Sequence, residues 1–146
     1  MKKEIAENFG GNLRVRVCGI LIEDNQVLMV RHGGLSEAGY LWAPPGGGLN
    51  FGQSAANCLK NEFQEETGLS IEVLDFLFAN EFHYHPLHAI ELFFKVAKSG
   101  GQLTTGFDPE LAANQQIIED VRFFSDKDIQ RHQGPQIHSI FRHVTH

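Results

Sequence analysis

Three glutamates in one short stretch, Glu62, Glu65 and Glu66, have the spacing that brings carboxylates together on a helix. Side chains three and four residues apart are neighbours on a helical surface, and like charges placed there repel one another. A partly buried group of carboxylates is costly unless a cation or shared protons neutralise it. Hard oxygen ligands of this kind suit a divalent ion such as Mg²⁺ or Mn²⁺. The spacing therefore indicates a metal site, against the ordinary alternative of solvated glutamates near a helix end.

The helix that carries these glutamates is predicted from the periodicity of residues 53–67, plotted at about 100° per residue. The polar face consists of Gln53, Asn57, Lys60, Asn61 and Gln64. The face expected to pack in the core consists of Ala56, Leu59 and Phe63. The glutamates lie above Ala55 and Cys58, so we expect them to point along the protein body. Thr67-Gly68 is a helix-stop signal. Upstream, Gly46, Gly47 and Gly48 predict a glycine-rich turn.

The stretch from Gly47 to Leu69 resembles the Nudix box, G-x5-E-x7-R-E-U-x-E-E-x-G-U, in which U is a bulky apolar residue. The residues in register are Glu62, Phe63, Glu65, Glu66, Gly68 and Leu69. Two positions depart from the family pattern, because Gln53 replaces its first glutamate and Asn61 replaces its arginine. Losing both removes a pair of opposite charges together, and the amides can still form hydrogen bonds. We therefore favour a working site with slower turnover over a dead one.

The resemblance implies an α/β fold, a Nudix-like α/β/α sandwich with a central mixed sheet. It implies metal-dependent hydrolysis of a phosphoanhydride in a nucleoside diphosphate linked to another group, as in a nucleotide, a nucleotide-sugar or ADP-ribose. The implied ligands of Mg²⁺ or Mn²⁺ are Glu62, Glu65, Glu66 and the carbonyl of Gly46, and the same glutamates are the implied catalytic residues. The alternative is a nucleotide-binding or sensing module that keeps the fold and the metal site but has lost hydrolysis. The resemblance also allows a homodimer.

A further carboxylate is expected to complete the metal site or to act as the general base. Glu110 and Asp120 are the candidates, with Asp108 and Glu119 as rivals. The residue types and the resemblance do not choose among these four or between them and the glutamates of the box.

Candidate substrate-binding residues are Arg31, His83 and Tyr84. Arg31 ends a predicted strand and could touch a phosphate, although a solvated arginine is an equal alternative. The run FHYHPLH predicts a strand-end loop at the mouth of the site, where imidazoles could contact phosphates. The His83 and His85 spacing also occurs in zinc sites, which is a weak signal. For Trp42, core packing is favoured over stacking on a base.

The elements expected to position these residues alternate along the chain. The sequence predicts strands over 13–22, 26–31, 40–45, 70–81, 89–98 and 117–124, a helix beginning after Ser125, and a closing helix over 136–144. A polar loop is expected over 102–116. Cys18 and Cys58 are expected to be buried free thiols. His132, His138 and His143 are interpreted as ordinary surface histidines.

With 146 residues, the chain is expected to form a single domain over 1–146. The formal net charge of −6 argues against broad binding to nucleic acid or anionic membranes. No stretch approaches the ~20 apolar residues that cross a bilayer, and the first residues lack the apolar run of a signal peptide. We expect a cytoplasmic protein whose partner is a small phosphorylated nucleotide.

Overall fold

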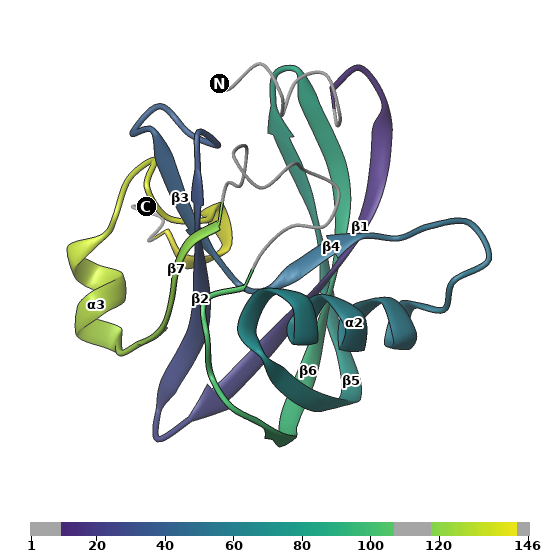
Figure 1. Cartoon of the computed structure of the whole chain (residues 1–146). Helices are drawn as coiled ribbons and strands as arrows, with labels where there is room; N and C mark the ends of the chain where they lie inside the picture. The colour runs from purple at the N-terminus through teal and green to yellow at the C-terminus, as the bar shows by residue number, and fades with distance from the viewer. Residues whose placement is uncertain (1–9, 107–117, 143–146) are drawn as a thin grey trace.

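The computed structural model of the protein describes residues 10–106 and 118–142. Its strands form two arms that diverge from one hairpin, β1 (Leu13–Glu23) and β2 (Gln26–Gly33), as Figure 1 shows. The turn between them places Asp24 and Asn25 at φ of 51° and 61°, the left-handed conformation that two-residue hairpin loops favour. β1 and β2 pair only next to this turn, through Ile22↔Val27 and Glu23↔Gln26. Beyond those residues each strand has its own partners.

The β1 arm contains β1, β4 (Gly46–Gly48), β5 (Leu69–Tyr84) and β6 (Leu87–Gly101). β1 runs parallel to β6, antiparallel to β4 on its other edge, and β5 is antiparallel to β6. The β2 arm contains β2, β3 (Tyr40–Ala43) and β7 (Ile118–Phe124), with both partners antiparallel to β2. The sheet is therefore mixed, which confirms the expected fold class.

Helices lie on both faces of this sheet because β2 alternates its apolar side chains between two cores. Leu28 and Val30 pack in a core with residues of α2 (Ala55–Thr67), whereas Val27 and Met29 pack with Trp42 in a second core. Ile129 of α3 (Asp126–Arg131) borders that second core. The chain thus forms the α/β/α layers that the sequence predicted, with Trp42 packed in the core. Among the described residues, no helix has the length and apolar character needed to span a bilayer.

α2 begins and ends at signals encoded in the chain itself. The Ser54 side chain accepts a hydrogen bond from the Asn57 N–H at the first turn. Gly68 ends the helix in the left-handed conformation, with φ of 75°, and its N–H donates to the Gln64 carbonyl. The predicted helix stop is confirmed. The predicted core stripe is wrong at Ala56, which is exposed, because the buried face runs instead through Cys58, Leu59, Phe63, Glu66 and Thr67.

Gly46–Gly48 form strand β4 and not the expected turn. None of the three has a positive φ, so their backbone conformation does not require glycine. Close approach does require it. A Cβ at Gly46 would overlap the Val17 carbonyl oxygen of β1, and a Cβ at Gly47 would overlap the Glu62 carboxyl group. Glycine here allows β1 and α2 to lie against the same short strand.

The C-terminal part differs from the predicted closing helix over 136–144. Only Ser139–Phe141 form a short 3-10 helix, and residues 143–146 lie outside the described part. Ile137 instead forms a parallel bridge with Trp42, and the His138 N–H donates to the Trp42 carbonyl. Pairing with β3 therefore holds these residues extended. Cys18 and Cys58 are buried thiols outside any disulfide, as expected.

Candidate active site

A pocket opens where the two arms diverge, and both arms and α2 line it. Its charged side chains are Arg14 and Arg16 of β1 and Glu62 and Glu66 of α2. Its apolar wall comes from Leu35, Leu41, Phe82 and Leu87. All three residues of β4 also line it, together with His32, His88 and His138. We call this the inner pocket.

The inner pocket contains two of the three predicted metal-binding glutamates. Glu66 is 5% exposed, and its Oε1 accepts a hydrogen bond from the Gly46 N–H at 2.9 Å. Glu62 is half-buried and lies over Gly47. Glu65 is also half-buried but does not line the inner pocket. The structure thus brings Gly46, Glu62 and Glu66 together and leaves Glu65 to the side.

These donors fit a magnesium-type ion by their chemistry. Within residues 10–106 and 118–142, no three His, Cys, Asp or Glu side chains are gathered into a complete metal-binding group. Mg²⁺ does not need one, because it usually keeps several waters and is bound through one or two carboxylates plus substrate phosphates. Glu62 and Glu66, in a pocket formed partly by backbone, meet that requirement. A closed zinc site at His83 and His85 gains no support from the described side chains.

Arg16 lies near the carboxylates of Glu62 and Glu66 and contacts the buried carboxylate of Glu91. Its Nη1 donates to Glu91 Oε2 at 3.1 Å, and its side chain is 22% exposed. Burial alone would lower the pKa of the Arg16 guanidinium, but the acidic groups around it, Cys18, Glu91, Glu66 and Glu62, raise it overall. Arg16 is therefore a permanent positive charge in the inner pocket. Burial raises the pKa of the nearby Cys18 thiol to about 12.

His32 is a neutral side chain in the same wall. It is 7% exposed, and burial, together with the nearby charge of Arg16, lowers its pKa to about 3. Its Nδ1 is buried without a hydrogen-bond partner among the described residues. His32 therefore contributes a neutral imidazole to the pocket.

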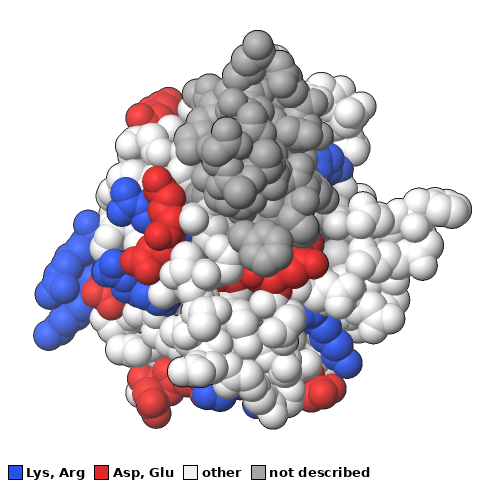
Figure 2. Space-filling view, viewed as in Figure 1, with Lys and Arg blue, Asp and Glu red and all other residues white. Residues whose placement is uncertain are grey.

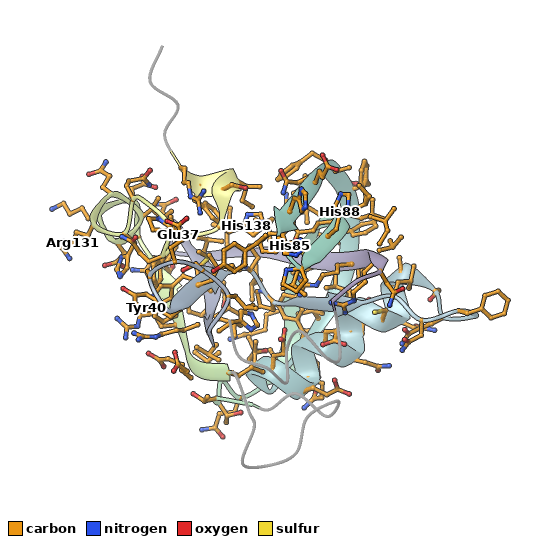
Figure 3. The ribbon with its side chains drawn as sticks, turned by 90° about the horizontal axis from the view of Figure 1, so that it is seen from above. Glu37, Tyr40, His85, His88, Arg131 and His138 are labelled. Atoms are coloured by element: carbon orange, nitrogen blue, oxygen red, sulfur yellow. The ribbon has the colours of Figure 1, made fainter. Side chains whose placement is uncertain are left out.

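His138 and Glu91 are site residues that the sequence did not reveal. His138 was predicted at the surface, but it is 2% exposed and its Nε2 lies 2.7 Å from Glu91 Oε1. Figure 3 places it in the middle of the molecule, between the hairpin that carries His85 and His88 and the loop that carries Glu37. The prediction failed because Glu91 is 47 residues away in sequence. The only local signal of a buried carboxylate was Arg16, because a cation in a strand that becomes buried needs an anionic partner.

The predicted substrate-binding residues divide into two groups. His83 and Tyr84 line a second pocket, the outer pocket, which shares Leu35, Leu41, Phe82 and His138 with the inner one. Arg31 lines neither pocket. Its Nε pairs with Glu119 Oε1 at 3.0 Å, and its guanidinium lies 3.9 Å from the centre of the Tyr40 ring.

The other candidate carboxylates lie outside the two pockets or outside the described residues. Asp120 Oδ2 pairs with Arg122 at 2.8 Å, and Glu119 pairs with Arg31 as above. Asp108 and Glu110 fall in 107–117, which the structure does not describe. The choice of a general base therefore stays open.

The two residues that replace the charged positions of the Nudix box lie just before α2 and on its exposed face. Gln53 precedes the Ser54 cap, and its Oε1 accepts from the Asn50 N–H at 3.3 Å. Asn61 is exposed. On the face seen in Figure 2, basic side chains gather at the left edge with acidic side chains next to them.

Comparison with known proteins decides the family. The sequence model of the NUDIX domain matches residues 12–143. The chain belongs to the Nudix family. Among its relatives is the Bacillus subtilis protein YjhB, named for a proposed ADP-ribose pyrophosphatase activity, which is 31% identical over 102 residues. That match covers 66% of this chain and 47% of the relative, so the chain spans about half the length of YjhB.

Solved structures of Nudix proteins share the fold. The MutT protein from Methanosarcina mazei Go1 superposes with a TM-score of 0.69 at 18% identity, covering 89% of this chain and 88% of that one. An ADP-ribose pyrophosphatase from Streptococcus suis superposes with a TM-score of 0.60 at 19% identity, covering 90% and 83%. At these identities the superpositions confirm the Nudix fold alone.

Proposed function

We propose that this Nudix protein is a metal-dependent hydrolase that cleaves a phosphoanhydride bond in a nucleoside diphosphate linked to another group. The observation that carries the proposal is that Glu62 and Glu66 of the Nudix box line one pocket beside Gly46. A Nudix domain that keeps these carboxylates in a pocket can bring an anionic diphosphate to them through a divalent ion. The names of the Bacillus subtilis and Streptococcus suis proteins make ADP-ribose the first substrate to test.

Five residues of the inner pocket would have a part in this reaction. The Gly46 N–H fixes the Glu66 carboxylate, and the close contact with Gly47 places Glu62 beside it. Together they would hold Mg²⁺ or Mn²⁺, which neutralises diphosphate charge and lowers the pKa of the attacking water. A carboxylate then takes the proton of that water. Arg16 supplies a permanent positive charge at the same place.

The outer pocket suits the part of the substrate that does not react. Phe82 and Tyr84 give it aromatic surface, and Ser36 adds a hydroxyl group. Aromatic rings bind planar groups such as a nucleobase by offset stacking. Because the two pockets share Phe82 and His138, one molecule can extend from one into the other.

The proposal is tested by incubating the protein with Mg²⁺ or Mn²⁺ and a panel of ADP-ribose, nucleotide-sugars and dinucleoside diphosphates. Hydrolysis of ADP-ribose at the phosphoanhydride yields AMP and ribose 5-phosphate, which chromatography resolves. We expect Glu62→Gln and Glu66→Gln to abolish turnover. Glu72→Gln is the matched control, because Glu72 is an exposed glutamate of β5 that pairs with Lys60 at the surface. No product from any substrate with either metal would refute the proposed hydrolysis.

A binding module is the second candidate, favoured by the loss of both charges at Gln53 and Asn61. It predicts that a nucleoside diphosphate derivative raises the melting temperature only when metal is present, without turnover. It also predicts no gain of activity in the double variant Gln53→Glu and Asn61→Arg. A gain of turnover in that variant would instead support a hydrolase slowed by the two departures.

A further inference from the structure

Glu91 is a carboxylate held away from water by side chains from three other parts of the fold. Its side chain is 1% exposed. Oε2 accepts from Arg16 of β1, and Oε1 accepts from Asn80 of β5 at 3.1 Å and contacts His138 at 2.7 Å. Burial would raise the pKa of Glu91, but the hydrogen bond from His138 and the charge of Arg16 lower it overall. We call these four residues the Glu91 network.

The hydrogen bonds of His138 show which of its ring nitrogens carries the proton. Its Nδ1 accepts from the Ile140 N–H at 3.2 Å, so the ring proton lies on Nε2 and is donated to Glu91. With a neutral His138, the network contains one negative and one positive charge, on Glu91 and Arg16. Apolar residues of similar volume often stabilise a fold as well as a buried ion pair does. Stability alone therefore does not explain why this position holds a charged group.

Arg16 is the member of the network that presents unused donors to the inner pocket. A guanidinium has five N–H donors in a fixed planar arrangement. Within the described residues, Arg16 makes one hydrogen bond, from Nη1 to Glu91. Its side chain is 22% exposed and lines the inner pocket with Glu62 and Glu66. The remaining donors are therefore available to a ligand bound beside these two carboxylates.

We propose that Arg16 binds a phosphate group of the substrate, and that Glu91 and His138 position its guanidinium for this contact. The proposal rests on the proposed function, which brings a diphosphate to Glu62 and Glu66. Planar guanidinium donors match phosphate oxygens in geometry and charge. Glu91 keeps the Arg16 side chain in one orientation, and His138 fixes Glu91 through a bond from the extended segment that pairs with β3.

The contact is tested by calorimetric titration with inorganic pyrophosphate in the presence of Mg²⁺. We expect Arg16→Gln to weaken pyrophosphate binding by about tenfold to a hundredfold, the effect of losing hydrogen bonds to a charged group. Arg16→Lys keeps the charge but loses the planar donors. Its affinity for pyrophosphate should therefore lie between those of the wild type and Arg16→Gln. The matched control is Arg131→Gln, because Arg131 is 71% exposed at the outer edge of α3 (Figure 3). Wild-type affinity in both Arg16 variants, or no pyrophosphate binding by the wild type, overturns the proposal.

The positioning role is tested by a double-mutant cycle. Glu91→Gln should weaken pyrophosphate binding in the wild type and have no further effect in the Arg16→Gln background. A purely structural role for Glu91 would weaken binding equally in both backgrounds, and that result overturns the positioning part. Removing one partner of a buried ion pair destabilises a fold strongly. Should Glu91→Gln fail to fold, His138→Gln takes its place in the same cycle, because it leaves both charges present.

Turnover separates failure of this inference from failure of the proposed function. If the wild type hydrolyses ADP-ribose, Arg16→Gln should raise KM by about tenfold or more, and Arg16→Lys by less. Hydrolysis with an unchanged KM and unchanged pyrophosphate affinity refutes the role of Arg16 and leaves the hydrolase in place. Binding of pyrophosphate that depends on Arg16, without turnover of any substrate, supports the role of Arg16 and refutes the hydrolase.

Discussion

Gly46 and Gly47 are adjacent residues for which the structure predicts opposite effects of the same substitution. A Cβ at Gly46 would overlap the Val17 carbonyl oxygen and lie 2.9 Å from the Cys18 Cα, and both atoms belong to the backbone of β1. That backbone cannot move aside without breaking strand pairing. We therefore expect Gly46→Ala to cost about 2 kcal/mol, as overpacking in a well-packed region does. For a chain of this size, that loss lowers the melting temperature by roughly 4–8 °C.

Gly47→Ala should leave stability almost unchanged and damage the site. The new methyl group would meet only the carboxyl end of Glu62, a flexible and half-buried side chain that can swing away. Replacing glycine by alanine also restricts the unfolded chain, which favours folding by about 0.4–1 kcal/mol and offsets the displacement of Glu62. The displaced carboxylate would no longer lie beside Glu66. We expect metal affinity to fall at least tenfold, the scale seen when a metal ligand loses its support.

Thermal unfolding and calorimetric titration with Mn²⁺ measure the two effects on the same samples. Gly46→Ala should show the lower melting temperature, and Gly47→Ala the weaker Mn²⁺ binding at a melting temperature close to that of the wild type. Equal destabilisation by both substitutions would refute the distinction between backbone and side-chain overlap. Wild-type Mn²⁺ affinity in Gly47→Ala would refute the role of Glu62 as a metal ligand.

Three further predictions concern stability and reactivity. The lowered pKa of His32 means that the unfolded chain binds a proton between about pH 6.5 and 3 that the folded protein does not, so stability falls as the pH is lowered through this range. From pH 7 to pH 5 the free energy of unfolding should fall by about 2 kcal/mol through His32. Urea unfolding of His32→Gln should lack this pH-dependent loss, and an equal loss in the variant would contradict the role of His32. Cys18, whose pKa is raised to about 12, should resist iodoacetamide at pH 8 in the folded protein and react after unfolding, as read by mass spectrometry; rapid alkylation of the folded protein contradicts its burial. Gly68→Ala should destabilise the protein by more than the roughly 1–2 kcal/mol that a left-handed alanine costs, because its Cβ would also overlap the Gln102 carbonyl oxygen. Gly11→Ala has a similar φ and no atom of the described residues within 4 Å of the added Cβ, so it should cost only the backbone part. Equal losses of stability in urea unfolding would rule out the overlap.

The parts of the site that were predictable from the sequence depend on local signals. The helix stop at Gly68 needs only the residues of one turn, and the inward direction of Glu66 follows from the helical period. The order of strands and helices suggested an α/β sandwich, and the family resemblance implied its central mixed sheet. These features are set by neighbours along the chain, so the sequence displays them directly.

The parts that were missed depend on contacts between distant residues. Arg16 meets Glu91 across 75 positions, and no periodicity within either strand indicates that pairing. The helical pattern after Gln136 was overridden because Ile137 pairs with Trp42 and His138 reaches Glu91. Gly46–Gly48 were interpreted through their own flexibility, whereas the backbone of β1 requires glycine at 46 and the side chain of Glu62 requires it at 47. In each case, a tertiary neighbour determined the local conformation.

The short pairing between β1 and β2 has a consequence for how the site can be altered. Within the described residues, the two strands share only Ile22↔Val27 and Glu23↔Gln26, while His138 joins the arms again at Glu91. Between these two links the arms are held together by packing, because Leu21 of β1 and Leu28 of β2 lie in the same core, which also contains Leu59 of α2. The distance between the arms, and with it the width of the inner pocket, therefore depends on core side chains that meet no ligand.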